Sequence, residues 1–320
     1  MEKNHIKIRT VFMGTSPLAE TVLEKLIEEK YNIVGVYTKQ DKKIGREQEL
    51  IATPVKKLAL KNSLSVFEPK RFDEETVKEL SQLKPDLIVV AAYGKILPPS
   101  VLSLPGFGCI NVHASLLPKF RGPSPIQNAL LLGEKETGIT IMLMDENVDT
   151  GEILTQEKIK VGANDTFEVL HDKLATQGAE LLAKTLPLWI GRKIEPITQD
   201  NEKATLCQLI ERNDGHIIWE DEARNIYNKY RALHHWPGIF TFWRNEEILL
   251  RLKLLEISIN EKISPTENHP GKVFKSENNV CIATLKGAIV IKEIQLEGKK
   301  AAKIEDFVNG YPKFIGTVLQ

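Results

Sequence analysis

Two polar side chains at the end of an apolar run, Asn111 and His113, have the residue types needed for acyl transfer to an amine. They lie two residues apart in CINVHASLLP, so a strand would project both from one side near its carboxyl end. A second run, ITIMLMDENVDTGEI, ends in a loop with Asp149, and the following Thr150 and Gly151 permit a sharp turn. The two loops could converge at one site.

Acyl transfer at such a site would need no covalent intermediate. The Asn111 amide and a His113 N–H could donate to a tetrahedral oxyanion, while Asp149 orients the ring and accepts protons. The attacking group would be the amine of the substrate, so no Ser or Cys nucleophile is required. The same spacing also fits a strand-capping asparagine and a core histidine, and spacing alone does not separate these alternatives.

The elements that position these residues follow from the hydrophobic pattern. From Ile6 to Met144, apolar runs alternate with amphipathic stretches, and DLIVVAA is apolar on both faces, as in parallel strands covered by helices. We predict an α/β domain with a Rossmann-like, doubly wound, mostly parallel sheet, in which ligands bind beyond the carboxyl ends of the strands. The opening VFMGTSPLAETVL lacks the GxGxxG pattern of dinucleotide-binding sites, which argues against a classical NAD site. Thr15 or Ser16 is therefore interpreted as a helix cap.

The remaining chain predicts a second domain. A helix is expected from about Asp165 to Leu186, so residues 1–190 form the predicted catalytic domain, and the polar stretch 191–205 is the predicted linker. Residues 206–320 contain a helix near Glu220 to Leu233 and several short alternating strands. These favour a small OB-like β-barrel.

Composition limits how the chain could bind RNA, span a membrane, form disulfides or hold a metal. The 320 residues include 43 basic and 43 acidic side chains, so any RNA contact must depend on local patches. No apolar run is long enough for a membrane span, and Cys109, Cys207 and Cys281 are too far apart for a disulfide framework or a CxxC metal site. We therefore expect a cytoplasmic, monomeric protein without a membrane segment or a metal.

The run from Asn111 to Gly151 resembles the signature of the 10-formyltetrahydrofolate-dependent formyltransferases. The resemblance implies that Asn111, His113 and Asp149 carry the chemistry and that 10-formyltetrahydrofolate is the formyl donor. It also implies a set of folate-site residues, for which ordinary packing remains an alternative at Tyr93, Ile96 and Leu97. The implied folate-site residues are Ser115, Leu116, Leu117, Pro118, Tyr93, Ile96, Leu97, Asp145 and Glu146. Lys95 is expected to be a solvated surface charge.

The formyl acceptor is indicated by a basic loop from Thr38 to Lys61, which holds seven Lys or Arg residues against three acidic ones. The loop resembles the insertion that methionyl-tRNA formyltransferases place against the acceptor stem. The implied RNA contacts are Lys42, Lys43 and Arg46. Glu47 and Glu49 depart from the usual basic pattern, and a merely solvated loop remains an alternative.

The segment ATLCQLIERNDGHIIWEDEARNIYNKYRALHHWPGIFTFW is similar to the part of methionyl-tRNA formyltransferases that leads into their barrel. We therefore predict formyl transfer to methionyl initiator tRNA. A nucleotide-sugar amine formyltransferase, a hydrolase of the formyl donor and a noncatalytic RNA-binding module are the rival interpretations.

Overall fold

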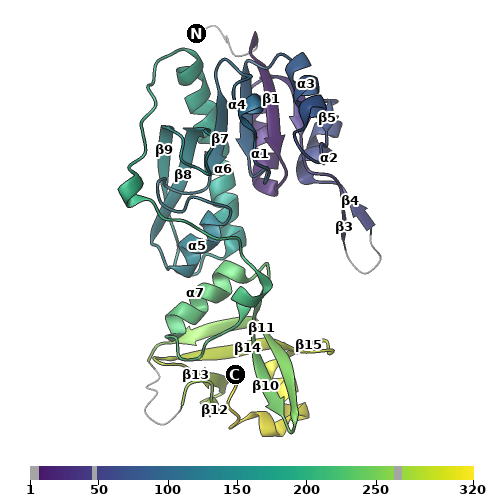
Figure 1. Ribbon diagram of the computed structural model, residues 1–320. Helices are drawn as coiled ribbons and strands as arrows, with labels where there is room; N and C mark the ends of the chain where they lie inside the picture. Colours follow the sequence, from purple (N-terminus) through teal and green to yellow (C-terminus); the bar gives the residue numbers. More distant parts are fainter. Residues whose placement is uncertain (1–6, 45–48, 263–268) are drawn as a thin grey trace. The chain divides into compact units, whose positions relative to one another are not determined.

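The computed structural model describes residues 7–44, 49–262 and 269–320 (Figure 1). The chain divides into two compact units. The first comprises 1–125, 136–160 and 169–208, and the second comprises 126–135, 161–168 and 209–320. The short segments 126–135 and 161–168 therefore group with the carboxyl-terminal unit.

The first unit is built on a seven-stranded sheet with the order β5-β2-β1-β6-β7-β8-β9. The strands are β1 (Arg9–Gly14), β2 (Asn32–Tyr37), β5 (Val66–Phe67), β6 (Leu87–Ala91), β7 (Cys109–His113), β8 (Glu136–Leu143) and β9 (Ile153–Lys160). The pairs from β5 to β7 are parallel, and β8 is antiparallel to both of its neighbours. The predicted mostly parallel sheet is confirmed.

Helices and one short hairpin accompany this sheet. The helices are α1 (Pro17–Glu28), α2 (Pro54–Lys61), α3 (Glu74–Gln82), α4 (Pro99–Leu102) and α6 (Phe167–Ile190). All but the first residue of α5 (Pro125–Leu131) belongs to the second unit. The hairpin strands are β3 (Lys42–Ile44) and β4 (Glu49–Ile51). Ser16 caps α1, since its side chain accepts from the backbone N–H of Ala19 at 3.4 Å, as predicted for one of two candidate caps.

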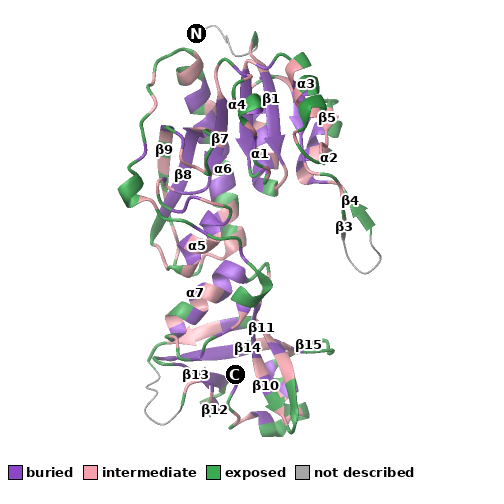
Figure 2. Ribbon diagram, in the orientation of Figure 1, coloured by how far each residue is buried: buried purple, intermediate pink, exposed green. Residues whose placement is uncertain are grey.

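The strand order fixes where a ligand can enter the sheet. All but the first residue of β1 are buried (Figure 2), as expected for a central strand with side chains packed on both faces. The chain runs from β1 to β2 on one side and later returns to β6 on the other. The carboxyl ends of β1 and β6 therefore form the topological switch point, and β7 lies directly beside β6.

The second unit is an antiparallel half-barrel with the order β10-β11-β14-β13-β12, and β15 pairs with β14. Its elements are α7 (Ala223–Leu233), β10 (Ile239–Asn245), β11 (Ile248–Asn260), β12 (Val273–Ser276), β13 (Asn279–Ala283), β14 (Ala288–Leu296), β15 (Ala301–Lys303) and α8 (Ile304–Gly310). Trp243 is 1% exposed and packs edge-on against Phe307, Tyr311 and Phe314. The fold class predicted for the whole chain is confirmed.

Arg231 on α7 ties the short segment 161–168 to the half-barrel unit. Its guanidinium donates to the carbonyl oxygens of Gly162 and Asp165 and to the Asn228 side chain. Arg231 is only 4% exposed, so these acceptors replace the water that its charge loses.

Within the described ranges, no helix is long and apolar enough to cross a bilayer.

Candidate active site

The three residues predicted to carry the chemistry lie together in the first unit. Asn111 and His113 lie on β7, of which His113 is the last residue, and Asp149 lies in the loop after β8. Asn111 Nδ2 donates to Asp149 Oδ1 at 3.4 Å, and His113 Nδ1 lies 3.6 Å from Asp149 Oδ2. The Gly122 N–H donates to the same Oδ2 at 2.8 Å. The carboxylate therefore contacts one strand, β7, and the loop that follows it.

The His113 ring is held from both sides. Its Nε2 lies 3.0 Å from the carbonyl oxygen of Phe120, which can only accept, so this nitrogen carries a hydrogen in that contact. Its Nδ1 faces Asp149, and the side chain is 6% exposed. The nitrogen turned toward the carboxylate, rather than Nε2, is thus the one available to a substrate.

The loop that presents Phe120 and Gly122 is fixed by a segment far along the chain. Thr205 accepts from the Phe120 N–H through its hydroxyl at 2.8 Å and from the Arg121 N–H through its carbonyl at 2.9 Å. Gly122 has φ +120°, and a Cβ there would lie 2.4 Å from the carbonyl oxygen of Cys207. Only glycine fits at this position without movement of the backbone.

Asp149 itself has a left-handed backbone with φ +54°. The side-chain Nε2 of Gln199 donates to the carbonyl oxygens of Asp149 at 2.9 Å and Gly151 at 2.7 Å. Arg121 in turn donates to Gln199 Oε1 from Nε and Nη2, at 3.1 and 2.8 Å. Arg121 and Gln199 are each 6% exposed, so they form a buried clamp on the Asp149 loop.

No role for Arg121 or Gln199 was predicted from the sequence. Gln199 lies in the segment 191–205 that was predicted to be a linker. Its neighbours in the sequence are also polar, so the pattern does not distinguish a residue that contacts Arg121 from a solvated one. Arg121 lies inside the run that carried the family resemblance, and this was the only sequence signal for either residue.

The predicted folate segment Ser115 to Pro118 forms a turn anchored on the neighbouring strands. The Thr140 hydroxyl donates to the Ser115 carbonyl at 2.7 Å and accepts from the Leu117 N–H at 3.1 Å. Gln156 donates to the Leu117 carbonyl at 2.8 Å. These contacts hold the turn directly after His113, while Leu116 and Pro118 remain half-buried.

The other predicted wall residues are dispersed. Tyr93 and Leu97 lie in a core cluster with Val11 and Met13, whereas Ile96 is 81% exposed. Burial raises the pKa of Tyr93 above its ordinary value. The placement of Tyr93 and Leu97 fits the packing alternative, and their contact with folate stays a prediction.

Lys95 is not the solvated charge that was expected. Its ammonium donates to the carbonyl oxygens of Pro69 and Lys70, the latter at 3.0 Å. Burial, followed by the nearby Lys39 charge, lowers the pKa of Lys95.

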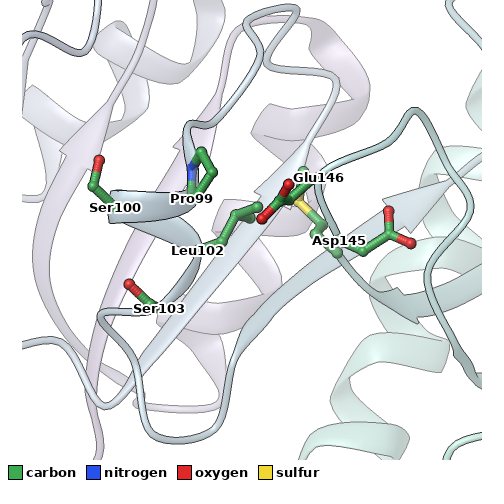
Figure 3. A pocket seen from close by; sticks show the side chains of 7 residues that line it. Pro99, Ser100, Leu102, Ser103, Asp145 and Glu146 are labelled. Carbon is green, nitrogen blue, oxygen red and sulfur yellow. The ribbon is translucent and has the colours of Figure 1, made fainter.

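A hollow of about 540 Å³ lies beside the loop after β8 (Figure 3). It is lined by Pro99, Ser100, Leu102, Ser103, Met144, Asp145 and Glu146. Asp145 is fixed there, since its carboxylate accepts from the Thr150 hydroxyl at 2.7 and 2.8 Å. Of the predicted folate residues only Asp145 and Glu146 line this hollow, and the contribution of α4 was not predicted.

The predicted RNA contacts are only partly within the described residues. Lys42 is exposed on β3 and Lys43 follows it, whereas Arg46 lies outside the described residues. Lys56, which was counted in the basic loop, is paired with Asp41 at 2.9 Å and Glu68 at 2.8 Å. The free positive charge of the loop is therefore smaller than the sequence count.

Cys207, which contacts the loop after β7, is not an activated nucleophile. Cys207 donates from Sγ toward the carbonyl oxygens of Phe120 at 3.5 Å and Arg121 at 3.3 Å. Burial raises the pKa of its thiol, which keeps the sulfur protonated.

Across the described ranges, no group of three or more His, Cys, Asp and Glu side chains could hold a metal ion.

The sequence of the chain matches the models of a known protein family. Residues 7–186 match the sequence model described as formyl transferase, and residues 209–312 match the formyl transferase C-terminal domain. The chain belongs to the formyl transferase family. It is an enzyme of this family, and the matched regions include most of both units.

Two relatives cover almost the whole chain. A methionyl-tRNA formyltransferase of Caldicellulosiruptor saccharolyticus is 45% identical over 313 residues, 97% of this chain and 99% of the relative. One of Caldanaerobacter subterraneus is 43% identical over 316 residues, 98% of this chain and 100% of the relative. The similarity to these relatives therefore extends over both units of the chain.

A solved structure shares the fold. An N-formyltransferase from Helicobacter canadensis, in complex with folinic acid and dTDP-3-aminofucose, is 20% identical with a TM-score of 0.65. The match covers 89% of this chain and 98% of that one.

Replacing Gln199 by Ala should lower the turnover of formyl transfer about ten- to a hundredfold, because the Asp149 loop would lose its clamp and small displacements of reacting groups are costly. The free energy of unfolding should fall by about 1–3 kcal/mol, since buried carbonyls and Arg121 lose a partner. Gln177→Ala is the matched control, because this half-buried side chain makes one 3.3 Å contact, with the Lys158 carbonyl, away from the site. Wild-type turnover in Gln199→Ala would contradict the positioning role.

Proposed function

We propose that this formyl transferase moves the formyl group of 10-formyltetrahydrofolate to the free amine of methionyl initiator tRNA. The observation that carries the proposal is the convergence of Asn111, His113 and Asp149 at the carboxyl end of β7. The acceptor is inferred from relatives named methionyl-tRNA formyltransferase that match nearly the full length of the chain.

The proposed reaction is a direct attack of the methionyl amine on the formyl carbon. A new C–N bond forms, the carbonyl electrons move to oxygen, and the tetrahedral intermediate then collapses with loss of the tetrahydrofolate nitrogen. The amine loses one proton, and the leaving nitrogen gains one, so the transfer is balanced. Asp149 is the group that accepts the proton from the attacking amine.

Two donors are proposed for the oxyanion. Asn111 Nδ2 carries two hydrogens, and its contact with Asp149 at 3.4 Å is long, so the amide can turn to an oxygen placed beside it. His113 Nδ1 is also directed to this point, because Phe120 holds the other ring nitrogen. Since Nε2 carries a hydrogen in that contact, Nδ1 donates to the oxyanion only in the imidazolium form, in which both ring nitrogens carry hydrogen. Preorganised donors of this kind stabilise charge that develops in the transition state.

The donor is proposed to bind along the turn 115–118 and the loop after β8. The hollow beside this loop, about 540 Å³, has the size of a small-molecule site. The structurally similar N-formyltransferase holds folinic acid, which supports a folate-derived donor in this fold.

The function is tested by the choice of acceptor. The full chain should formylate charged methionyl initiator tRNA with 10-formyltetrahydrofolate, and aminosugar nucleotides or water should accept the formyl group far more slowly. Transfer to an aminosugar nucleotide with higher kcat/KM than to charged tRNA would overturn the proposed acceptor. Hydrolysis of the donor at the same rate with and without acceptor would indicate a hydrolase.

Asn111→Ala and His113→Ala should each lower turnover by about two to three orders of magnitude, because each removes a proposed oxyanion donor. Asp149→Asn should also slow the reaction, since the amide cannot accept the proton, while donor binding should change less. Asn279→Ala and His269→Ala, at exposed positions, are the matched controls. Near-normal turnover in the Asn111 and His113 variants would refute the assignment.

Arg46→Ala should weaken the binding of charged tRNA and reduce the slope of log K against log salt by about 0.9, the value for one contact with a duplex phosphate. Lys184→Ala, an exposed cation on α6 outside the basic loop, should leave the slope unchanged. Affinities measured at several salt concentrations provide the test. An unchanged slope in Arg46→Ala would show that this loop residue does not contact RNA.

A further inference from the structure

The β10–β11 hairpin carries an aromatic and basic cluster that the proposed chemistry does not use. The strands are antiparallel neighbours (Figure 1), with Phe242 opposite Arg251 and Phe240 opposite Lys253. Opposed residues project to one face, and the face alternates along each strand, so these four side chains share a face that excludes the core residue Trp243. With His216, they make up the hairpin face.

Three rings of the hairpin face pack together. The His216 ring lies 5.4 Å from both phenylalanine rings, and Phe240 and Phe242 meet edge to face at 5.7 Å. Phe240 is 4% exposed, whereas Phe242 and His216 are half-buried. Phe242 and His216 therefore retain ring surface that solvent or a ligand can reach.

The Arg251 guanidinium lies over the Phe240 ring, with its central carbon 3.5 Å from the ring centroid. Its Nε is buried and has no hydrogen-bond partner in the part of the chain that the structure describes. The nearby Glu297 carboxylate accepts from the Arg251 backbone N–H at 3.1 Å. The buried Nε is therefore out of reach of a ligand, and an oxyanion would be bound by the outer nitrogens of the stacked guanidinium.

Positive charge on this face is not neutralised by ion pairs. Among the described residues, Arg251 and Lys253 form no salt bridge, and neither does Arg244 at the end of β10. Unpaired cations beside accessible rings are what proteins use to bind single-stranded nucleic acid, because bases stack on rings while cations contact phosphates. An acidic protein segment would satisfy the cations but would leave the rings without a stacking partner.

We propose that the hairpin face binds an unpaired nucleotide of the RNA acceptor. The base stacks on Phe242 and His216, and the phosphate oxygens accept from Arg251 and Lys253. The inference rests on the proposed function, since RNA is the acceptor there, and it adds a contact that depends on stacking as well as charge.

The test measures binding of charged methionyl initiator tRNA to the full chain at several salt concentrations. Phe242→Leu should weaken affinity about five- to tenfold with an unchanged salt slope, because stacking involves no counterion release. Arg251→Ala should reduce the slope by about 0.7, the value for one single-strand phosphate contact. Arg251→Lys should keep the slope but weaken affinity, since the charge remains and the planar contact is lost.

Matched controls lie on β12, at the opposite edge of the sheet order. Lys275→Ala removes an exposed cation, and Phe274→Leu shortens a partly buried ring, and neither should change affinity or slope. Thermal unfolding should show that all variants are folded. If Arg251→Ala unfolds, Arg251→Lys and Phe242→Leu still decide the outcome.

Wild-type affinity and slope in Phe242→Leu and Arg251→Lys would overturn the site, as would equal losses in the β12 controls. Binding of poly-glutamate that is lost in these variants, with tRNA binding unchanged, would assign the face to an acidic protein and overturn the RNA site. A wild-type chain that binds charged tRNA through this face but does not formylate it would refute the proposed function alone. A wild-type chain that binds no RNA would refute both.

Discussion

A partly buried carboxylate needs hydrogen-bond donors to replace the water it loses, and the first unit is arranged around this requirement at Asp149. The donors come from separate places: the Gly122 N–H from the loop after β7, and Asn111 from β7 itself. The backbone of Asp149 is left-handed, and Gln199 satisfies its carbonyl from a segment beyond α6. Together these contacts hold the carboxylate beside His113.

This arrangement explains why the strand order matters to the chemistry. The antiparallel return of β8 beside β7 brings the loop after β8 to the site through a register that pairs Asn111 with Met142 and His113 with Thr140. The Thr140 hydroxyl then fixes the turn at Ser115 and Leu117. A single pair of strands thus positions both the proposed oxyanion donors and the proposed folate turn.

The sequence predicted the features that are encoded locally. Runs such as DLIVVAA indicated covered parallel strands, and the spacing of Asn111 and His113 placed both on one strand end. The clamp was not predictable, because Arg121 and Gln199 are 78 positions apart and polar residues in a polar stretch look like a linker. Tyr93 and Leu97 show the opposite problem, since an apolar residue near a site fits a ligand wall and a packed core equally well.

The distribution of charge determines how this chain would recognise RNA. With 43 basic and 43 acidic residues, the protein has no net field to attract a polyanion from a distance. Within the basic loop, Lys56 is already neutralised by Asp41 and Glu68, so counting charges in the sequence overstates what a phosphate would meet. Affinity must then come from a few short-range contacts. A stacked guanidinium such as Arg251 suits this situation, because its geometry discriminates between ligands in a way that diffuse charge does not.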